Sequence, residues 1–457
     1  MPDLKMTKRP RHGHIPPAST GNDEPLSTPS VQAIQWLRLL SGRASTSVFV
    51  RVTAAALSFL VCITAARALS ITDYGVLSML IAAVNLGAVV ALLGHETLAT
   101  RVVAAMPDST DTVSRYRAGV VRAVRRIAVV TGVIIVLGFF ATGHLNGSGG
   151  LIAVAAFACM PFCVARARFV QGLVRGKHLP GLALVPDGLA RPALTIVLMA
   201  LTLPWVGGRL WIIAADMALA ALFALLLALS IERRLFDRFE PRTQKPHTKG
   251  HGDFSAQIYL SSLLAVFVSQ VAVLLVGHLS DPGQAALYDS AARFAAVSAL
   301  IPQSLYVAIS PRIAQYYALD NKTALRTLLR RYTRLSTLAT ALVALALAGF
   351  SFQLMQIFGT AYTQAGSALK ILLLSVLVNA ASGPTGMVLL MTGHESLHSL
   401  ALAVSLAFQI VLCFLLIPPY GFAGAAVAVL ASTIVWNVLM MGFIHSRLGL
   451  RPALAWA

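Results

Sequence analysis

The stretch "LALAVSLAFQIVLCFLLIPPYGFAGAAVAVLASTIVWNVLMMGFI", residues 400–444, decides the fold class. It holds two apolar runs separated by Pro-Pro-Tyr-Gly, and it contains no charged residue. A hydrocarbon core of roughly 30 Å needs about 20 mostly apolar residues for each helical span. The two runs therefore predict two membrane-spanning helices, near 396–417 and 422–445, joined by a short turn.

Similar apolar segments recur along the whole chain. Its 457 residues are 57% hydrophobic and only 12% charged, whereas soluble proteins average about 25% charged residues. The sequence therefore predicts an all-α polytopic membrane protein with about twelve transmembrane helices. The other ten spans are expected near 45–69, 75–100, 127–143, 149–165, 181–204, 209–231, 254–279, 285–311, 335–358 and 366–392.

The placement of basic residues predicts the topology. A net charge of +19 would suggest nucleic acid for a soluble protein, but here thirty of the thirty-six Lys and Arg residues lie in the tails and on alternate connections. The opposite connections, such as "HLNGSGG", "SDPGQ" and "PPYG", contain none. Because cytoplasmic loops carry the excess of Lys and Arg, both termini are expected in the cytoplasm, and nucleic acid is not an expected partner.

Two halves of the chain resemble each other at an offset of about 215 residues. "DYGVLSMLIAAV" from residue 73 matches "LYDSAARFAAVS" from residue 287 weakly, and other stretches follow in the same order. Six spans per half predict parallel repeats around a central cavity, the natural place for a ligand. The predicted parts are a disordered basic cytoplasmic tail (1–44), an N-terminal six-helix bundle (45–232), a cytoplasmic linker (233–253), a C-terminal six-helix bundle (254–447) and a cytoplasmic C-terminus (448–457).

Two Asp/Arg pairs lie inside predicted spans, where a central charge costs about 2.5–3.5 kcal/mol. Arg293 lies on the order of 12 Å below the helix edge, and Asp289 is one turn earlier; Asp187 and Arg191 repeat the spacing. The pairs either only make buried arginines tolerable, or hold guanidinium groups ready for an anionic headgroup, which arginine grips bidentately. Arg51 is either a third such cation near the cytoplasmic mouth or a snorkelling residue at a helix start.

Two further acids, Glu96 and Asp216, are candidates for proton coupling, because a buried carboxyl group favours its protonated form. Glu96 with His95 near a helix end is more often an interface pair. The sequence shows no phosphate-binding loop, no nucleophile elbow and no metal-ligand spacing. The chain is therefore expected to be neither an enzyme nor a cofactor or metal protein, and its four cysteines, all in predicted spans, are expected to be free.

Several stretches carry a resemblance to a known family. "ARALSITDYGVLSML" (66–80), "ALYDSAARFAAVSALIPQSLYVAISPRIAQYY" (286–317), "FGTAYTQAGSALKILLLSVLVNAASGPTGMVLLMTGHES" (358–396) and "YGFAGAAVAVLASTIVWNVL" (420–439) resemble polysaccharide-export flippases. These form the Wzx-like branch of the multidrug/oligosaccharidyl-lipid/polysaccharide exporter superfamily. The resemblance covers roughly residues 45–450. The seventh span, "SQVAVLLVGHL", lacks the acid that many members carry there.

The resemblance implies two six-helix bundles and alternating access. It implies that undecaprenyl-diphosphate-linked oligosaccharide moves from the inner to the outer leaflet of a bacterial cytoplasmic membrane, for exopolysaccharide or other surface polysaccharide biosynthesis. Membrane lipids, a polysaccharide polymerase and export machinery are the implied partners. A cation-coupled multidrug antiporter of the same fold is the alternative, although a cavity for cationic drugs should be acidic, and the deep charges here are balanced or basic.

Overall fold

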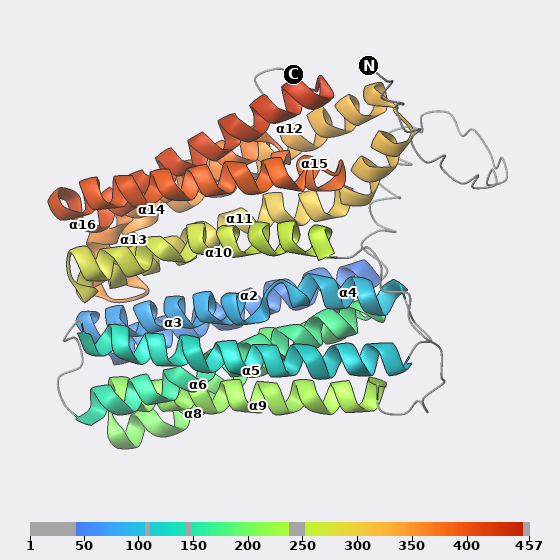
Figure 1. Cartoon of the computed structure of the whole chain (residues 1–457). Coiled ribbons are helices and arrows are strands. Elements are labelled where there is room, and N and C mark those ends of the chain that lie inside the picture. Colours follow the sequence, from blue (N-terminus) through green and yellow to red (C-terminus); the bar gives the residue numbers. More distant parts are fainter. Residues whose placement is uncertain (1–42, 106–109, 142–147, 237–251, 451–457) are drawn as a thin grey trace, which may run out of the picture. The chain divides into compact units, whose positions relative to one another are not determined.

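The computed structural model describes residues 43–105, 110–141, 148–236 and 252–450 (Figure 1). By internal contacts the chain divides into two units, residues 1–46 and 47–457, and the account below concerns the second. The predicted N-terminal tail up to residue 42, most of the predicted linker and the last seven residues lie outside the described residues. The described residues form helices and no strand.

The first half of the chain forms one group of helices in Figure 1. Its two short segments α7 and η1, the second a π-helical turn, lead into α8. The elements are α2 (Arg43–Ala68), α3 (Ile71–Leu92), α4 (His95–Ala105), α5 (Thr110–Ala141), α6 (Ser148–Gly176), α7 (Pro180–Leu184), η1 (Val185–Ala190), α8 (Arg191–Val206) and α9 (Leu210–Phe236).

The second half forms the other group of helices (Figure 1). A short helix and a 3-10 turn link its third and fourth spans. The elements are α10 (Gly252–Leu279), α11 (Pro282–Ala318), α12 (Lys322–Gly349), α13 (Ser351–Gln356), η2 (Thr360–Ala365), α14 (Gly366–Ser382), α15 (Thr385–Met391) and α16 (Glu395–Leu448).

Element α16 contains two membrane spans, which a break in the helix separates. Eleven described helices are long and apolar enough to cross a membrane, but the 54 residues of α16 at about 1.5 Å each greatly exceed the hydrocarbon thickness. The helix is broken at Gly421, which has φ 54° and ψ −133°, and Pro418 and Pro419 just before it have no N–H to donate. The side chain of Gln284 accepts the N–H of Phe422 at 3.2 Å. Counting α16 twice gives the twelve crossings that the sequence predicts.

Several helix boundaries differ from the sequence prediction. The span predicted over 75–100 is two helices, because Leu93 and Gly94 adopt positive φ values of 48° and 73° and end α3. The basic stretches predicted as loops, 101–126 and 312–334, are largely helical. Apolar runs mark the thickness of the hydrocarbon core, whereas a helix can continue into the headgroup region with its charges in water.

Helix α3 connects the two halves. It packs on α5 and α6 of its own half and on α10 and α11 of the other. The backbones of α3 and α11 touch at one point. Gly75 lies directly against the carbonyl group of Pro282, so a side chain as small as the methyl group of alanine does not fit at position 75. Small residues allow such close approach between membrane helices. The two halves are therefore held together at the beginning of α3.

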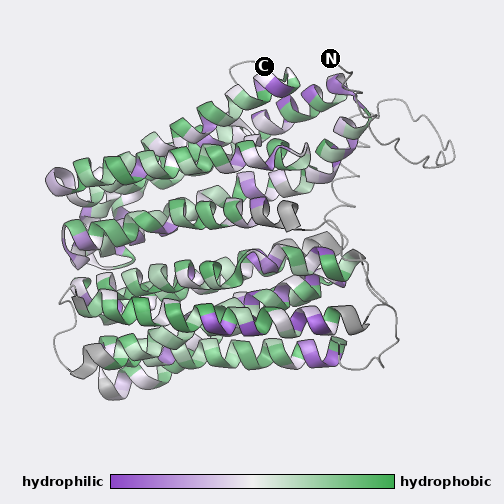
Figure 2. Ribbon diagram, in the orientation of Figure 1, coloured by the Kyte–Doolittle hydropathy of each residue, from purple (hydrophilic) through white to green (hydrophobic). Residues whose placement is uncertain are grey.

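Hydrophobic residues dominate the middle of the helices, and hydrophilic residues concentrate toward the end where α9 finishes and α10 begins (Figure 2). Large apolar side chains are exposed on the outer helices, for example Leu137 and Phe140 on α5 and Leu338 and Leu342 on α12. Contiguous exposed apolar surface of this kind marks contact with membrane lipid.

A buried ion triad joins three helices of the first half. One carboxylate oxygen of Glu232 on α9 accepts a hydrogen bond from Arg117 Nε at 2.7 Å. The other carboxylate oxygen accepts a hydrogen bond from Arg166 Nη2. Glu232 is 2% exposed, and Arg166 Nη1 is buried without a hydrogen-bond partner. The single buried carboxylate therefore contacts two guanidinium groups.

We predict that Glu232→Gln destabilises the protein by about 3–5 kcal/mol, because it removes the buried carboxylate that Arg166 contacts and breaks a buried ion pair. The free energy of unfolding is measured by titrating SDS into mixed micelles. The matched control is Asp320→Asn, which removes an exposed carboxylate 3.9 Å from Lys322 and should change stability by at most about 1 kcal/mol. Equal effects of the two substitutions would contradict this assignment.

Candidate cavity site

Two prolines shape the first part of the fifth predicted span. In "PGLALVPDGLARP" (180–192), Pro186 and Pro192 begin the π-helical turn and α8, and each removes a backbone N–H from the helix. π-Helical turns carry one extra residue per turn and occur often at functional sites. This turn holds Asp187, and Arg191 follows directly after it.

The first charged cluster contains two arginines and one aspartate. Asp187 Oδ1 lies 3.2 Å from Arg191 Nε, and Asp187 Oδ2 lies 3.8 Å from Arg168 Nε. Arg168 Nη2 also donates to Asn85 Oδ1 on α3 at 3.1 Å. With both guanidinium groups protonated and the aspartate ionised, the cluster has a surplus of one positive charge.

The second cluster lies on α11 and reaches across to α3. Arg293 Nε is 2.7 Å from Asp289 Oδ2, so the predicted pair forms. The same carboxylate oxygen accepts the hydroxyl group of Tyr74 at 3.1 Å. Asp289 and Tyr74 are both buried. The contact between Tyr74 and Asp289 joins residues from different halves of the chain.

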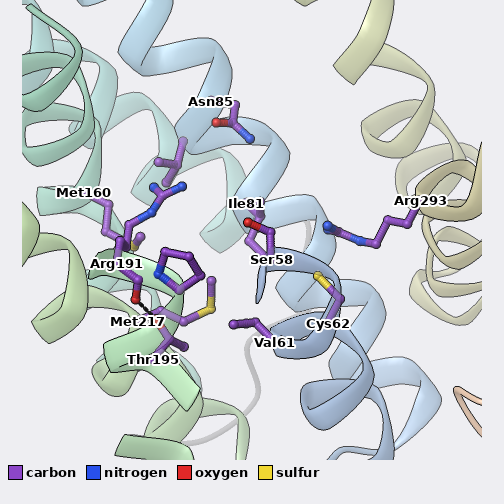
Figure 3. Close-up of a pocket in the computed structure, with 12 residues that line it drawn as sticks. Ser58, Val61, Cys62, Ile81, Asn85, Met160, Arg191, Thr195, Met217 and Arg293 are labelled. Carbon is purple, nitrogen blue, oxygen red and sulfur yellow. Dashed lines mark hydrogen bonds between the residues drawn. The ribbon is translucent and has the colours of Figure 1, made fainter. Parts of the chain in front are cut away.

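The arginines of both predicted Asp/Arg pairs, Arg191 and Arg293, line one cavity (Figure 3). The cavity has a volume of about 100 Å³. In Figure 3 the side chains of Arg191 and Arg293 enter it from opposite sides, with Ser58 and Ile81 between them. Its lining residues are Ser58, Val61, Cys62, Ile81, Val84, Asn85, Met160, Arg191, Pro192, Thr195, Met217 and Arg293. This lining contains two cations and no carboxylate.

The other predicted site residues lie elsewhere. Arg51 is exposed near the start of α2 and is not among the residues that line the cavity. Glu96 forms an ion pair with Arg175 at 2.8 Å rather than with its neighbour His95. His95 Nδ1 lies 3.1 Å from the hydroxyl group of Tyr116, and burial lowers the pKa of His95.

Asp216 is the buried acid nearest to the cavity along the sequence. It is 4% exposed and precedes Met217, a lining residue. Thr202 Oγ1 donates to Asp216 Oδ2 at 2.8 Å. Within the part of the chain that the structure describes, no Lys, Arg or His forms an ion pair with it. Asp216 therefore differs from Asp187, Asp289 and Glu96, each of which lies beside an arginine.

Sequence reasoning missed two residues of the site, Arg168 and Tyr74. Arg168 lies just beyond the predicted span 149–165, where the strongly apolar run ends, but α6 continues to Gly176 and brings Arg168 to Asn85 and Asp187. Tyr74 lies in the first of the two stretches that resemble each other, which does not indicate its partner. Its contact with Asp289 spans 215 residues of sequence, and no local pattern indicates it.

Two family models and one curated protein match this chain. Residues 43–317 match the family model described as polysaccharide biosynthesis protein, and residues 258–415 match the MatE model. A probable low-salt glycan biosynthesis flippase, Agl15 of Haloferax volcanii, is 24% identical over 253 residues. That match covers 54% of each chain, so this chain spans about half the length of the relative it matches.

Solved structures share the fold at low identity. An inward-facing multidrug resistance MATE family transporter of the MOP superfamily gives a TM-score of 0.70 at 14% identity, covering 88% of this chain and 98% of that one. The lipid II flippase MurJ in an inward closed conformation gives 0.67 at 13%, covering 87% of both. A MOP superfamily transporter from Pyrococcus furiosus, described as having a binding pocket of reverse polarity, gives 0.62 at 15%, covering 90% and 98%.

These structures show the two-lobed helical fold, and the first family model covers more than half of the residues. The chain belongs to the family whose model is described as polysaccharide biosynthesis protein.

Proposed function

We propose that this protein is a flippase for undecaprenyl-diphosphate-linked oligosaccharide, which it moves from the inner to the outer leaflet of a bacterial cytoplasmic membrane with both of its own termini in the cytoplasm. The observation that carries the proposal is that Arg191 and Arg293, from different halves of the chain, line one cavity. The diphosphate is the part of this substrate that needs such a site. The match to a glycan flippase supports the substrate class.

The arrangement of the arginines suits a diphosphate. A guanidinium group stays protonated and presents a planar set of donors to phosphate oxygens. Arg191 and Arg293 each use Nε on an aspartate, which leaves Nη donors for a ligand. Arg168 adds the surplus positive charge beside Arg191 through their shared Asp187. We therefore include Arg168 with Arg191 and Arg293 in the proposed headgroup site.

The size of the cavity indicates how the substrate enters. Sites for drug-sized ligands usually measure about 300–1,000 Å³, whereas this cavity measures about 100 Å³. An oligosaccharide needs more room than this cavity offers. Alternating access, in which one bundle moves against the other around the site, provides that room.

The alternative function, export of cationic drugs, is less well supported by the lining. A cationic ligand is best bound by an unpaired acid, and none of the twelve lining residues is acidic. Asp187 and Asp289, beside the lining arginines, are already engaged by them. Asp216 is a nearby buried acid without a basic partner among the described residues, but it is not among the residues that line the cavity. The two lining cations therefore favour an anionic ligand.

We predict that Arg191→Gln or Arg293→Gln each weakens headgroup binding about 10- to 100-fold, the range for losing a charged hydrogen bond, and that the double variant stops flipping. The measurement is the leaflet distribution of the lipid-linked oligosaccharide in cells that lack the protein and carry each variant, read with a membrane-impermeant probe. Arg209→Gln is the matched control, because Arg209 is exposed and does not line the cavity. Normal transfer by the double variant at normal protein level would refute the proposed site.

We further propose that Asp216, rather than Glu96, binds a proton if a proton gradient drives transport. Glu96 already lies in an ion pair with Arg175 at 2.8 Å. Asp216 is buried with the hydroxyl group of Thr202 as its hydrogen-bond donor, and a hydroxyl partner tolerates both protonation states.

We expect Asp216→Asn to abolish the acceleration of transport by an imposed pH gradient in proteoliposomes, while Glu96→Gln retains it. The amide keeps the size and polarity of the side chain but cannot bind a proton reversibly. The measured quantity is the initial rate of substrate transfer with and without the pH gradient, at equal amounts of reconstituted protein. Acceleration of Asp216→Asn equal to that of the wild type would exclude Asp216 as the coupling group.

A further inference from the structure

We infer that Tyr74 and Asp289 form a latch between the two halves of the protein, and that an anion bound at Arg293 releases it. The inference rests on the proposed function, because the anion is the headgroup phosphate of the proposed substrate. The central atom is Asp289 Oδ2, which accepts hydrogen bonds from Arg293 Nε at 2.7 Å and from the Tyr74 hydroxyl group at 3.1 Å. One oxygen atom therefore contacts both the cavity arginine and the opposite half of the chain.

The position of the latch makes it part of the contact between the halves. Tyr74 is followed by Gly75, which lies against the carbonyl group of Pro282 at the start of α11. The Tyr74 ring packs edge-on against Phe358 and Tyr362, with centroids 6.4 and 5.9 Å away. This packing fixes the ring, so the hydroxyl group can reach Asp289 only while α3 and α11 stay together.

The charge balance around Asp289 explains how a ligand acts on the latch. Asp289 is buried, and Arg293 is the counter-charge it contacts among the described residues. A phosphate that binds the remaining donors of Arg293 brings a second negative charge to the same guanidinium group. Two anions then share one cation in a medium of low dielectric constant, where a buried charge without full compensation is costly.

Separation of α3 from α11 relieves this repulsion. It admits water to Asp289, which restores the solvation of the carboxylate while Arg293 holds the phosphate. The hydrogen bond from Tyr74 breaks in the same movement, since Tyr74 is carried by α3, whereas Asp289 and the rings of Phe358 and Tyr362 that Tyr74 packs on belong to the second half of the chain. Binding at the cavity and opening at the start of α3 are therefore linked, and by reciprocity the closed latch weakens anion binding.

The test uses the full-length protein in nanodiscs with spin labels at Thr72→Cys and Ser280→Cys and with the four native cysteines replaced by alanine. Thr72 and Ser280 are exposed and lie next to the latch, at the start of α3 and just before α11. The distance distribution between the labels is measured by double electron–electron resonance with and without inorganic pyrophosphate. Pyrophosphate affinity is measured on the same samples by calorimetry.

We expect pyrophosphate to shift the wild-type distribution to longer distances. Tyr74→Phe should show the longer distances without ligand and bind pyrophosphate roughly threefold more tightly, the factor for an average hydrogen bond between membrane helices. Tyr306→Phe is the matched control, because it removes a tyrosine hydroxyl bond to Ala380 within one half of the chain, and it should behave as the wild type. A purely structural role for Tyr74 predicts equal or weaker binding instead.

The outcomes separate this inference from the proposed function. Pyrophosphate binding that depends on Arg293 but leaves the distances unchanged overturns the latch and leaves the anion site standing. Tyr74→Phe with unchanged distances and unchanged affinity also overturns the latch. Failure of the wild type to bind pyrophosphate overturns both proposals.

Discussion

A charge inside a membrane is stable only beside an opposite charge or water, and this constraint organises the interior of the protein. A helix that places Arg191 or Arg293 within a span must supply a partner, and each has an aspartate one turn earlier. The cost of an unpaired central charge, about 2.5–3.5 kcal/mol on insertion scales, is large enough to enforce the pairing. The same pairing leaves Nη atoms of each guanidinium group free to meet a ligand.

Features encoded by local spacing could be predicted from the sequence. The apolar runs gave the twelve crossings, and Pro418, Pro419 and Gly421 marked the turn inside α16. The four-residue spacing of Asp289 and Arg293 placed both side chains on one helix face, and the ion pair forms. In each case the interacting residues lie within one turn or one short connection, where helix geometry leaves little freedom.

Contacts between distant helices could not be predicted in this way. The site needs Arg168 to meet Asn85, 83 residues away, and Tyr74 to meet Asp289, 215 residues away. Both depend on how α3 packs, since α3 touches both halves of the chain. Arg168 was also misassigned because hydropathy reports where the apolar run stops, whereas α6 continues for another eleven residues to Gly176.

The relatives show that this fold alone does not specify a substrate. Structures described as multidrug transporters and as a lipid II flippase share it with this chain at 13–14% identity. What differs between such proteins must lie in the side chains that line the cavity. Here the lining combines two arginines with apolar and small polar residues and contains no acid. A cavity of this kind suits an anion, and its cations come from both halves of the chain. If the proposed function holds, recognition of the headgroup and movement of the bundles depend on the same few side chains.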